Sequence, residues 1–281
     1  MLNHIGQIPA AAAFKFSNKD ALVFEGRTFS FNEINDLVER AAGGLSDLGI
    51  VQGDTVTLYA ANSWEWIVSY YAIARLGAVI NPVNTMLTPS EIEYVVKDCG
   101  AKAIIASPEK VAAIMGVKEV SDVEEIISFG SDIADGAISF DALIAANISA
   151  PTPVEIDPAN LSTIGYTSGT TGHPKGAMQS HRAVITNGAM TSQMQMRGAD
   201  DCIVSALPCP HVYANVIMMS MMMFGSKLVL HRAFDVDLAF ADITAHKATI
   251  FDGVPAMYMF MLNSPTIKDA DLSSLTRCYV G

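Results

Sequence analysis

The sequence predicts an α/β fold of layered sheets flanked by helices. Short apolar runs alternate with stretches of helical periodicity along the 281 residues, and this alternation is typical of layered strands and helices. Hydrophobic residues form 51% of the chain and charged residues only 16%, a balance that a disordered segment does not have. A chain of this length corresponds to about two domains.

A cluster of prolines predicts where the chain divides. Pro151, Pro153 and Pro158 lie close together, and prolines at this density interrupt regular structure. We therefore expect a first α/β subdomain over residues 1–150 and a second, incomplete α/β subdomain over residues 151–281.

Two capping boxes predict helix starts in the first subdomain. Ser30 and Glu33 have the spacing in which each side chain binds the other residue's backbone N–H, and an apolar helical face follows them. Thr88–Glu91 repeats the pattern with a proline at the first helical position. Periodicity predicts three further elements, namely a helix over 64–76 capped by Asn62 or Ser63 and buried strands over 55–60 and 103–106.

The second subdomain continues the alternation without repeats or low-complexity tracts. Strands are expected over 162–166, 203–206, 227–230, 249–251 and 276–280. Helices are expected over 182–194, 212–224 and 238–246, the last with Asp235 or Asp237 as its cap.

Charge and targeting signals narrow the classes of function. The chain has 29 acidic and 17 basic residues and a net charge of −12, and it lacks the clustered basic face with which proteins bind nucleic acids. Its N-terminus lacks the basic and long apolar regions of a secretory signal. The uncharged stretch over 208–226 contains prolines, a histidine and serines, which a lipid-exposed span would not carry. We expect a cytoplasmic protein that is not transmembrane and binds no nucleic acid.

The four cysteines indicate neither a disulfide framework nor a metal site. Cys99, Cys202, Cys209 and Cys278 form no CxxC pair and have no histidine-rich spacing beside them. We expect reduced, mostly buried thiols, as in a reducing compartment.

One loop combines the groups that polyphosphate binding needs. The string YTSGTTGHPKG, residues 166–176, follows an apolar strand and contains several glycines and four Ser or Thr hydroxyls. Glycine lets the backbone approach a ligand closely. Backbone N–H groups and hydroxyls can then surround phosphate oxygens, and Lys175 adds a positive charge. Lys175 lies between Pro174 and Gly176, so the loop is not a Walker A motif. A surface loop without a ligand is the alternative.

The string resembles the phosphate-binding signature of the adenylate-forming superfamily, which includes acyl-CoA synthetases, aryl-CoA ligases, peptide-synthetase adenylation domains and luciferases. Four other segments resemble this family, and together they cover essentially the whole chain. They are TFSFNEINDLVERAAGGLSDLGIVQG (28–53), WEWIVSYYAIARLGAVINPVN (64–84), ALPCPHVYA (206–214) and FDGVP (251–255).

The resemblance implies an enzyme that joins a carboxylate to AMP, releases pyrophosphate and passes the acyl group to CoA, with ATP, Mg²⁺ and CoA as cofactors and co-substrates. His211 matches the family's histidine at the junction of acyl pocket and nucleotide and is the candidate catalytic residue, with a structural role as the alternative. Tyr213 and Ile217 match positions that line the acyl pocket. The resemblance implies that the ATP phosphates contact Thr167, Ser168, Gly169, Thr170, Thr171, Gly172 and Lys175.

The expected acid is a fatty acid. Five methionines between Met218 and Met223 crowd the helix that follows the pocket motif, and methionine suits an adaptable apolar tunnel. Ordinary core filling is the alternative for these methionines, and an aryl acid is the alternative substrate. An amino acid is less favoured because the pocket motif has no acidic residue to meet an amino group.

The sequence departs from the family pattern at two places. Pro210 and Ala214 replace an aromatic residue and a glycine beside the histidine of the pocket motif. The chain also stops at Gly281, before the family's adenine-binding segment, ribose-binding aspartate, hinge and C-terminal domain with its catalytic lysine. We expect an N-terminal fragment that is inactive alone. The alternative is a naturally short, non-catalytic nucleotide- or acyl-binding module or partner subunit.

Overall fold

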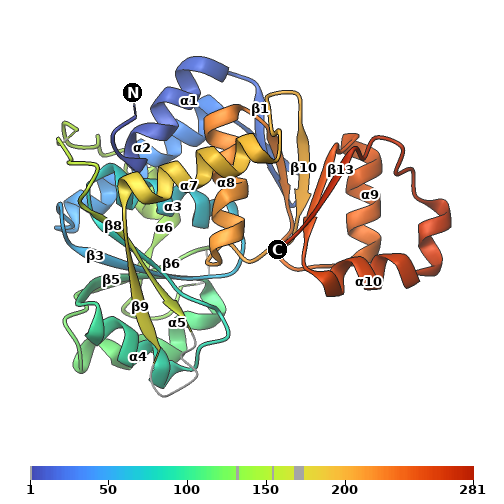
Figure 1. The fold of residues 1–281 in the computed structure, drawn as a ribbon. Helices are drawn as coiled ribbons and strands as arrows, with labels where there is room; N and C mark the ends of the chain where they lie inside the picture. The colour runs from blue at the N-terminus through green and yellow to red at the C-terminus, as the bar shows by residue number, and fades with distance from the viewer. Residues whose placement is uncertain (1, 131–132, 154, 168–173) are drawn as a thin grey trace. The chain divides into compact units, whose positions relative to one another are not determined.

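A computed structural model describes residues 2–130, 133–153, 155–167 and 174–281 (Figure 1). The chain forms two compact units, each with its own sheet. Met1–Ala11, Ile34–Ala61 and Glu65–Thr186 form the first unit, and Ala12–Glu33, Asn62–Trp64 and Asn187–Gly281 form the second. Helices accompany both sheets, so the expected α/β class is confirmed.

The sheet of the first unit has the strand order β7-β6-β5-β3-β4-β8-β9. Neighbouring strands are parallel except for β8 and β9, which are antiparallel. The strands are β3 (Thr55–Tyr59), β4 (Val79–Pro82), β5 (Ala101–Ala106), β6 (Glu125–Ser128), β7 (Ile138–Ser139), β8 (Leu161–Thr167) and β9 (Lys175–Ser180). The accompanying helices are α3 (Trp64–Arg75), α4 (Pro89–Asp98), α5 (Pro108–Ile114) and α6 (Phe140–Ala145), with 3-10 turns at Ile5–Gln7 and Met115–Glu119.

The core of this unit lies around the central strands. Every residue of β3 is buried, as expected for a parallel strand with elements packed on both faces. In α3 every residue from Trp66 to Arg75 is buried, and the Trp66 ring stacks on Tyr70 with centroids 5.5 Å apart. A helix that is apolar on all sides is stable only inside a protein.

The sheet of the second unit has the order β13-β12-β10-β11-β1-β2. Its strands are β1 (Asp20–Phe24), β2 (Arg27–Ser30), β10 (Cys202–Ser205), β11 (Lys227–Leu230), β12 (Ile250–Gly253) and β13 (Arg277–Val280). All neighbours are parallel except β1 and β2. The helices of this unit are α8 (Val212–Phe224), α9 (Val236–His246) and α10 (Pro255–Asn263), with a 3-10 turn at Pro265–Asp269. Three further helices each contain several residues of both units, namely α1 (Ile8–Phe16), α2 (Phe31–Asp47) and α7 (His181–Met194).

The two faces of this sheet have different neighbours. Helices α8 and α9 flank the strands on opposite sides (Figure 1). The α9 side has a row of paired apolar residues, Val23, Val229, Val204 and Phe251, which pack in one cluster with Phe240 of α9. Since successive residues of a strand point to opposite faces, the next row along the strands points to the α8 side.

The sheets divide the chain differently from the boundary expected at 150/151. Leu22 in β1 pairs with Leu228 in β11, so an N-terminal segment belongs to the second sheet. Thr163 in β8 pairs with Ile80 in β4, so a segment beyond the prolines belongs to the first. The proline cluster therefore marks the connection from α6 to β8 within the first unit rather than the limit of a compact unit.

A two-residue turn lets the two N-terminal strands, β1 and β2, pair in the second sheet. Strands β1 and β2 are joined by Glu25 and Gly26, whose φ angles are 47° and 79°. Two consecutive positive φ angles define the hairpin turn that matches the natural twist of paired strands. Sequence patterns missed this hairpin because Glu-Gly is a weaker turn signal than Asn-Gly or Asp-Gly.

The expected helix caps are mostly confirmed. Glu33 N–H donates to Ser30 Oγ at 3.2 Å and Ser30 N–H donates to Glu33 Oε2 at 2.7 Å. Thr88 and Glu91 form the second capping box, and Asp235 caps α9. Asn62 has a different role, described below.

The sequence and the structure agree on several other features. The expected strands and helices at 55–60, 64–76, 103–106 and throughout 162–251 match elements to within a few residues. The four cysteines are free thiols, but only Cys202 and Cys209 are buried, whereas Cys99 is half-buried and Cys278 is exposed. Within the described part of the chain, every helix is too short or too polar to cross a membrane.

Candidate functional site

The base of the predicted phosphate loop is a strand pair. Thr167 ends β8 and Lys175 begins β9, and the two residues lie opposite each other in antiparallel register. Both side chains are exposed. Ser168, Gly169, Thr170, Thr171 and Gly172, which the sequence assigns to phosphate binding, lie outside the described residues.

Tyr166 anchors this strand pair. Its hydroxyl donates to Asp98 Oδ2 at 2.5 Å, and burial together with that carboxylate raises the pKa of Tyr166 well above its usual value. The ring lies beside Gly176, where an added Cβ would be 3.1 Å from Tyr166 Cζ and 2.8 Å from Ile164 Cγ2. The glycine after Lys175 therefore makes room for the Tyr166 ring on the neighbouring strand.

The predicted acid-pocket motif forms the connection from β10 to α8. Its loop is held by Asn62, whose Nδ2 donates to the carbonyls of Leu207 and His231, both at 2.9 Å. Asn62 Oδ1 accepts from Cys209 N–H at 2.7 Å. All three contacts are buried, so Asn62 fixes the path of the motif instead of capping α3.

His211 lies at the start of α8. Its Nδ1 accepts from Tyr213 N–H at 3.4 Å, which makes it the N-cap of the helix, and its side chain is exposed. The geometry therefore assigns the imidazole a capping contact through one ring nitrogen.

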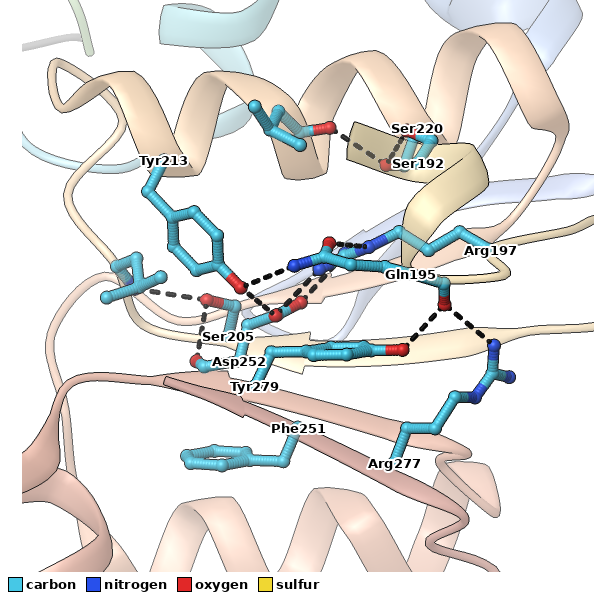
Figure 2. A network of polar contacts seen from close by, with 12 residues as sticks. Ser192, Gln195, Arg197, Ser205, Tyr213, Ser220, Phe251, Asp252, Arg277 and Tyr279 are labelled. Atoms are coloured by element: carbon cyan, nitrogen blue, oxygen red, sulfur yellow. Dashed lines mark hydrogen bonds and ion pairs between the residues drawn. The ribbon is translucent and has the colours of Figure 1, made fainter. Parts of the chain in front are cut away.

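Tyr213 is the candidate pocket residue with the most extensive contacts (Figure 2). Its hydroxyl donates to Asp252 Oδ1 at 2.9 Å and accepts from Gln195 Nε2 at 3.3 Å. Burial and the nearby Asp252 carboxylate raise the pKa of Tyr213 to about 12. The ring packs against Gly281, where an added Cβ would be 2.8 Å from Tyr213 Cδ1.

Asp252 forms a fully buried ion pair with Arg197. Two guanidinium nitrogens donate to the two carboxylate oxygens at 2.8 Å each, and neither side chain is exposed. Burial raises the pKa of Asp252, and the Arg197 guanidinium opposes that rise. Bidentate geometry of this kind is the strongest form of the Arg–carboxylate contact.

Ile217 lies one helical turn beyond Tyr213 on α8 and is 2% exposed. Residues four apart share a helix face, so the structure brings Tyr213 and Ile217 together. The neighbouring Met218, Met219, Met221 and Met222 are all buried. They extend around the helix rather than along one face, which fits the core-filling interpretation of the methionines.

The sequence patterns did not single out Gln195 and Arg197, and they gave Asn62 only as a possible helix cap and Asp252 only as part of the FDGVP segment. One signal was available, because Asp252 is a single carboxylate in an otherwise apolar strand segment, and a buried acid needs a partner. The partner comes from 55 positions away in the chain, which sequence patterns cannot pair. No group of three or more His, Cys, Asp or Glu side chains in the described ranges is placed to hold a metal ion.

Comparison with known proteins identifies the family. The model of the AMP-binding enzyme family matches residues 10–281. This chain belongs to that family. The predicted resemblance to adenylate-forming enzymes is therefore confirmed over nearly the full sequence.

The curated relatives of this AMP-binding chain are CoA ligases. It is 36% identical to 4-coumarate–CoA ligase 5 of Oryza sativa, over 89% of this chain and 47% of the relative. Identity is 32% to indoleacetate–CoA ligase of Aromatoleum aromaticum, over 99% of this chain and 53% of the relative. A mitochondrial medium-chain acyl-CoA ligase of Rattus norvegicus is 28% identical, over 96% and 49%. The chain thus spans about half the length of these relatives.

Solved structures agree with this family assignment. The anthranilate CoA ligase AuaEII in complex with anthranoyl-AMP superposes with a TM-score of 0.91 at 24% identity, over 98% of this chain and 54% of that one. The N-terminal domain of FACL13 from Mycobacterium tuberculosis gives 0.89 at 28% identity, over 99% and 69%. The fold is that of the N-terminal part of adenylate-forming enzymes.

Proposed function

We propose that this chain is the N-terminal portion of an ATP-dependent, AMP-forming carboxylic acid–CoA ligase. The observation that carries the proposal is the AMP-binding family match over residues 10–281, with CoA ligases as the curated relatives. In the proposed reaction a substrate carboxylate oxygen attacks the α-phosphorus of ATP and pyrophosphate leaves. The thiol of CoA then attacks the acyl carbon, and AMP leaves.

The segment from Thr167 to Lys175 would bind the ATP phosphates. The exposed positions of Thr167 and Lys175 at a strand-pair base support this role, since a compact ammonium group and hydroxyls stabilise the charge that shifts onto leaving pyrophosphate. Mg²⁺ would enter as part of the MgATP substrate, because this ion is commonly held by substrate phosphates and few protein ligands.

The phosphate role is tested with Lys175→Ala in the full-length protein. Acid-dependent exchange of labelled pyrophosphate into ATP should show a KM for ATP raised at least tenfold. Lys268→Ala is the matched control, since Lys268 is also exposed and lies in the 3-10 turn at Pro265–Asp269. An unchanged KM for ATP in the Lys175 variant would remove this residue from the site.

His211 would take part in catalysis at the start of α8. One substitution can separate this catalytic role from the residue's role as N-cap of the helix. Asparagine is among the best N-cap residues, so His211→Asn keeps the cap and removes the imidazole. We expect a 10- to 100-fold loss of exchange rate, a size typical of losing a group that acts in proton transfer or charge stabilisation. Full activity of this variant would assign His211 to capping alone.

The proposed acid is a fatty acid, with an aryl acid as the second candidate. The buried, apolar Ile217, one helical turn beyond Tyr213 on α8, supports an apolar acyl group. The names of two relatives, a 4-coumarate and an indoleacetate ligase, favour the aryl alternative. Pyrophosphate exchange with decanoate, 4-coumarate, indoleacetate and phenylalanine ranks these classes directly.

The 281 residues alone are expected to turn over no acid. If the full-length protein shows no pyrophosphate exchange with any of these acids, the ligase function is rejected and a nucleotide- or acyl-binding module is favoured. Exchange by the 281 residues alone would show instead that they already contain a complete adenylation site.

A further inference from the structure

The hydroxyl of Tyr213 has both of its hydrogen-bonding roles filled inside the protein. It donates its proton to Asp252 Oδ1 at 2.9 Å and accepts an N–H from Gln195 at 3.3 Å. A phenol has one proton to donate, and that proton is directed at a buried carboxylate. A ligand beside Tyr213 therefore meets the ring, and not a free hydroxyl donor.

Asp252, which accepts the hydrogen bond from Tyr213, is itself held in place by Arg197. Both oxygens of Asp252 bind Arg197, whose Nε donates in turn to Gln195 Oε1 at 2.7 Å. Gln195 thus contacts Arg197 through its oxygen and Tyr213 through its nitrogen. The four side chains close a ring of hydrogen bonds (Figure 2), and partners in such a ring orient one another.

The turn that carries Gln195 and Arg197 is fixed from a separate strand. Tyr279 of β13 donates its hydroxyl to the Gln195 carbonyl at 2.6 Å. Arg277 of β13 donates to the carbonyls of Gln195 and Met196 and pairs with Asp201. The guanidinium of Arg197 also lies over the Tyr279 ring, 5.2 Å from its centroid.

We infer that Asp252, Arg197 and Gln195 are positioning residues for the acid substrate, which hold Tyr213 in one orientation and occupy its hydroxyl so that only its ring meets the acid. This inference rests on the proposed function, in which Tyr213 lines the acid pocket. It names a property of the substrate, namely an acyl or aryl body that needs no hydrogen bond from Tyr213.

The substrate arm uses Tyr213→Phe in the full-length protein and compares 4-coumarate with cinnamate, which lacks the ring hydroxyl. We expect the specificity constants kcat/KM for the two acids to fall by similar factors, so that the coumarate-to-cinnamate ratio of kcat/KM changes less than threefold. A site that binds a substrate hydroxyl rejects the analogue without it by large factors. A tenfold or larger fall of the coumarate-to-cinnamate ratio would therefore overturn the inference.

The positioning arm uses Gln195→Leu, which removes one contact to Tyr213 and leaves the Arg197–Asp252 pair intact. We expect the KM for the acid to rise five- to tenfold while the KM for ATP stays within twofold. Gln193→Leu is the matched control, because the same substitution on the exposed side of α7 should change neither constant. If Gln195→Leu changes the KM for the acid and the KM for ATP by similar factors, or changes neither, Gln195 is merely structural.

The two proposals fail differently. Absence of any acid-dependent exchange in the unmodified protein contradicts the ligase function itself. Exchange that is normal in the unmodified protein, with an acid KM insensitive to Gln195→Leu, contradicts only the positioning role.

Discussion

Single buried polar residues determine much of this molecule's chemistry. The Arg197–Asp252 pair has no exposed side-chain area, and removing one partner of such a pair typically costs about 3–5 kcal/mol because the other charge stays buried. Asn62 uses both ends of its amide on backbone groups. These residues act by fixing the positions of neighbouring groups, and their effects on stability and on function are therefore linked.

A buried histidine makes stability depend on pH. His181 is completely buried, and its Nδ1 accepts from Ile5 N–H, which requires the neutral ring. Burial, with a smaller contribution from His4, lowers the pKa of His181 to about 4. In the unfolded chain the pKa is about 6.5. Between these values the unfolded state binds more protons, so the free energy of unfolding falls as the pH falls from about 6.5 to 4.

We expect this loss to amount to about 3 kcal/mol between pH 7 and pH 4. Urea unfolding of the chain at a series of pH values measures it. His181→Gln should flatten the dependence above pH 4.5, where the carboxylates remain ionised. A slope equal to that of the unsubstituted chain would exclude His181 as its source.

Backbone geometry at Met196 gives a second prediction at this scale. Met196 has a φ of 48° and is 73% exposed, and this conformation costs a non-glycine residue about 1–2 kcal/mol. Met196→Gly should therefore stabilise the chain slightly, by roughly 0.5 kcal/mol after the entropy of glycine is counted. Met190→Gly, in the interior of α7 and 61% exposed, should instead destabilise by about 1 kcal/mol. Thermal unfolding of both variants provides the comparison.

At the scale of elements, sequence reasoning succeeded where a local signal determines the result. The capping boxes at Ser30 and Thr88 need only four consecutive residues, and both are confirmed. The β1–β2 hairpin and the edge strands β7 and β9 were missed because short strands carry little periodicity. Among these strands β1 also depends on a distant partner, since Leu22 pairs with Leu228 of β11.

The same limit applies to the candidate site. The loop string and the pocket motif could be recognised from consecutive residues. The ring formed by Tyr213, Asp252, Gln195 and Arg197 could not, because its members come from α8, β12 and the turn after α7. Only the fold brings these side chains together.

Helix α2 offers a prediction at this scale. Gly43 lies within the helix, and a Cβ there would overlap the carbonyl oxygen of Ile148. Because the obstacle is backbone, Gly43→Ala should destabilise the chain by at least about 2 kcal/mol. Gly116 has no atom within 4 Å of its Cβ position, so Gly116→Ala should change stability by less than about 0.5 kcal/mol. Equal unfolding midpoints for the two variants would contradict the close approach.

At the scale of the molecule, each sheet draws on distant parts of the sequence. The second sheet needs β1 and β2 from residues 20–30, and residues 161–180 pair within the first sheet. The alternating pattern correctly predicted the fold class, because that class depends on the order of elements. It did not predict the compact units, because these depend on which strands pair.

A truncation tests this division. A fragment of residues 151–281 would keep β10 beside β11 but lack β1 on the other side of β11, and it would carry β8 and β9 without β4. We expect it to show no cooperative unfolding transition and to aggregate, since unpaired sheet edges promote association. The complete 281-residue chain is the control. Cooperative unfolding of the fragment would support the boundary at 150/151 instead.

The parallel pairing of β1 with β11 also has a consequence for synthesis. Leu22 pairs with Leu228, and ribosomes add roughly 5–20 residues per second. The β1–β2 hairpin therefore leaves the ribosome roughly 10–40 seconds before its partner strand exists. During that interval its apolar residues have only the nascent chain and chaperones to contact. The second sheet can be completed only after most of this sequence has been translated.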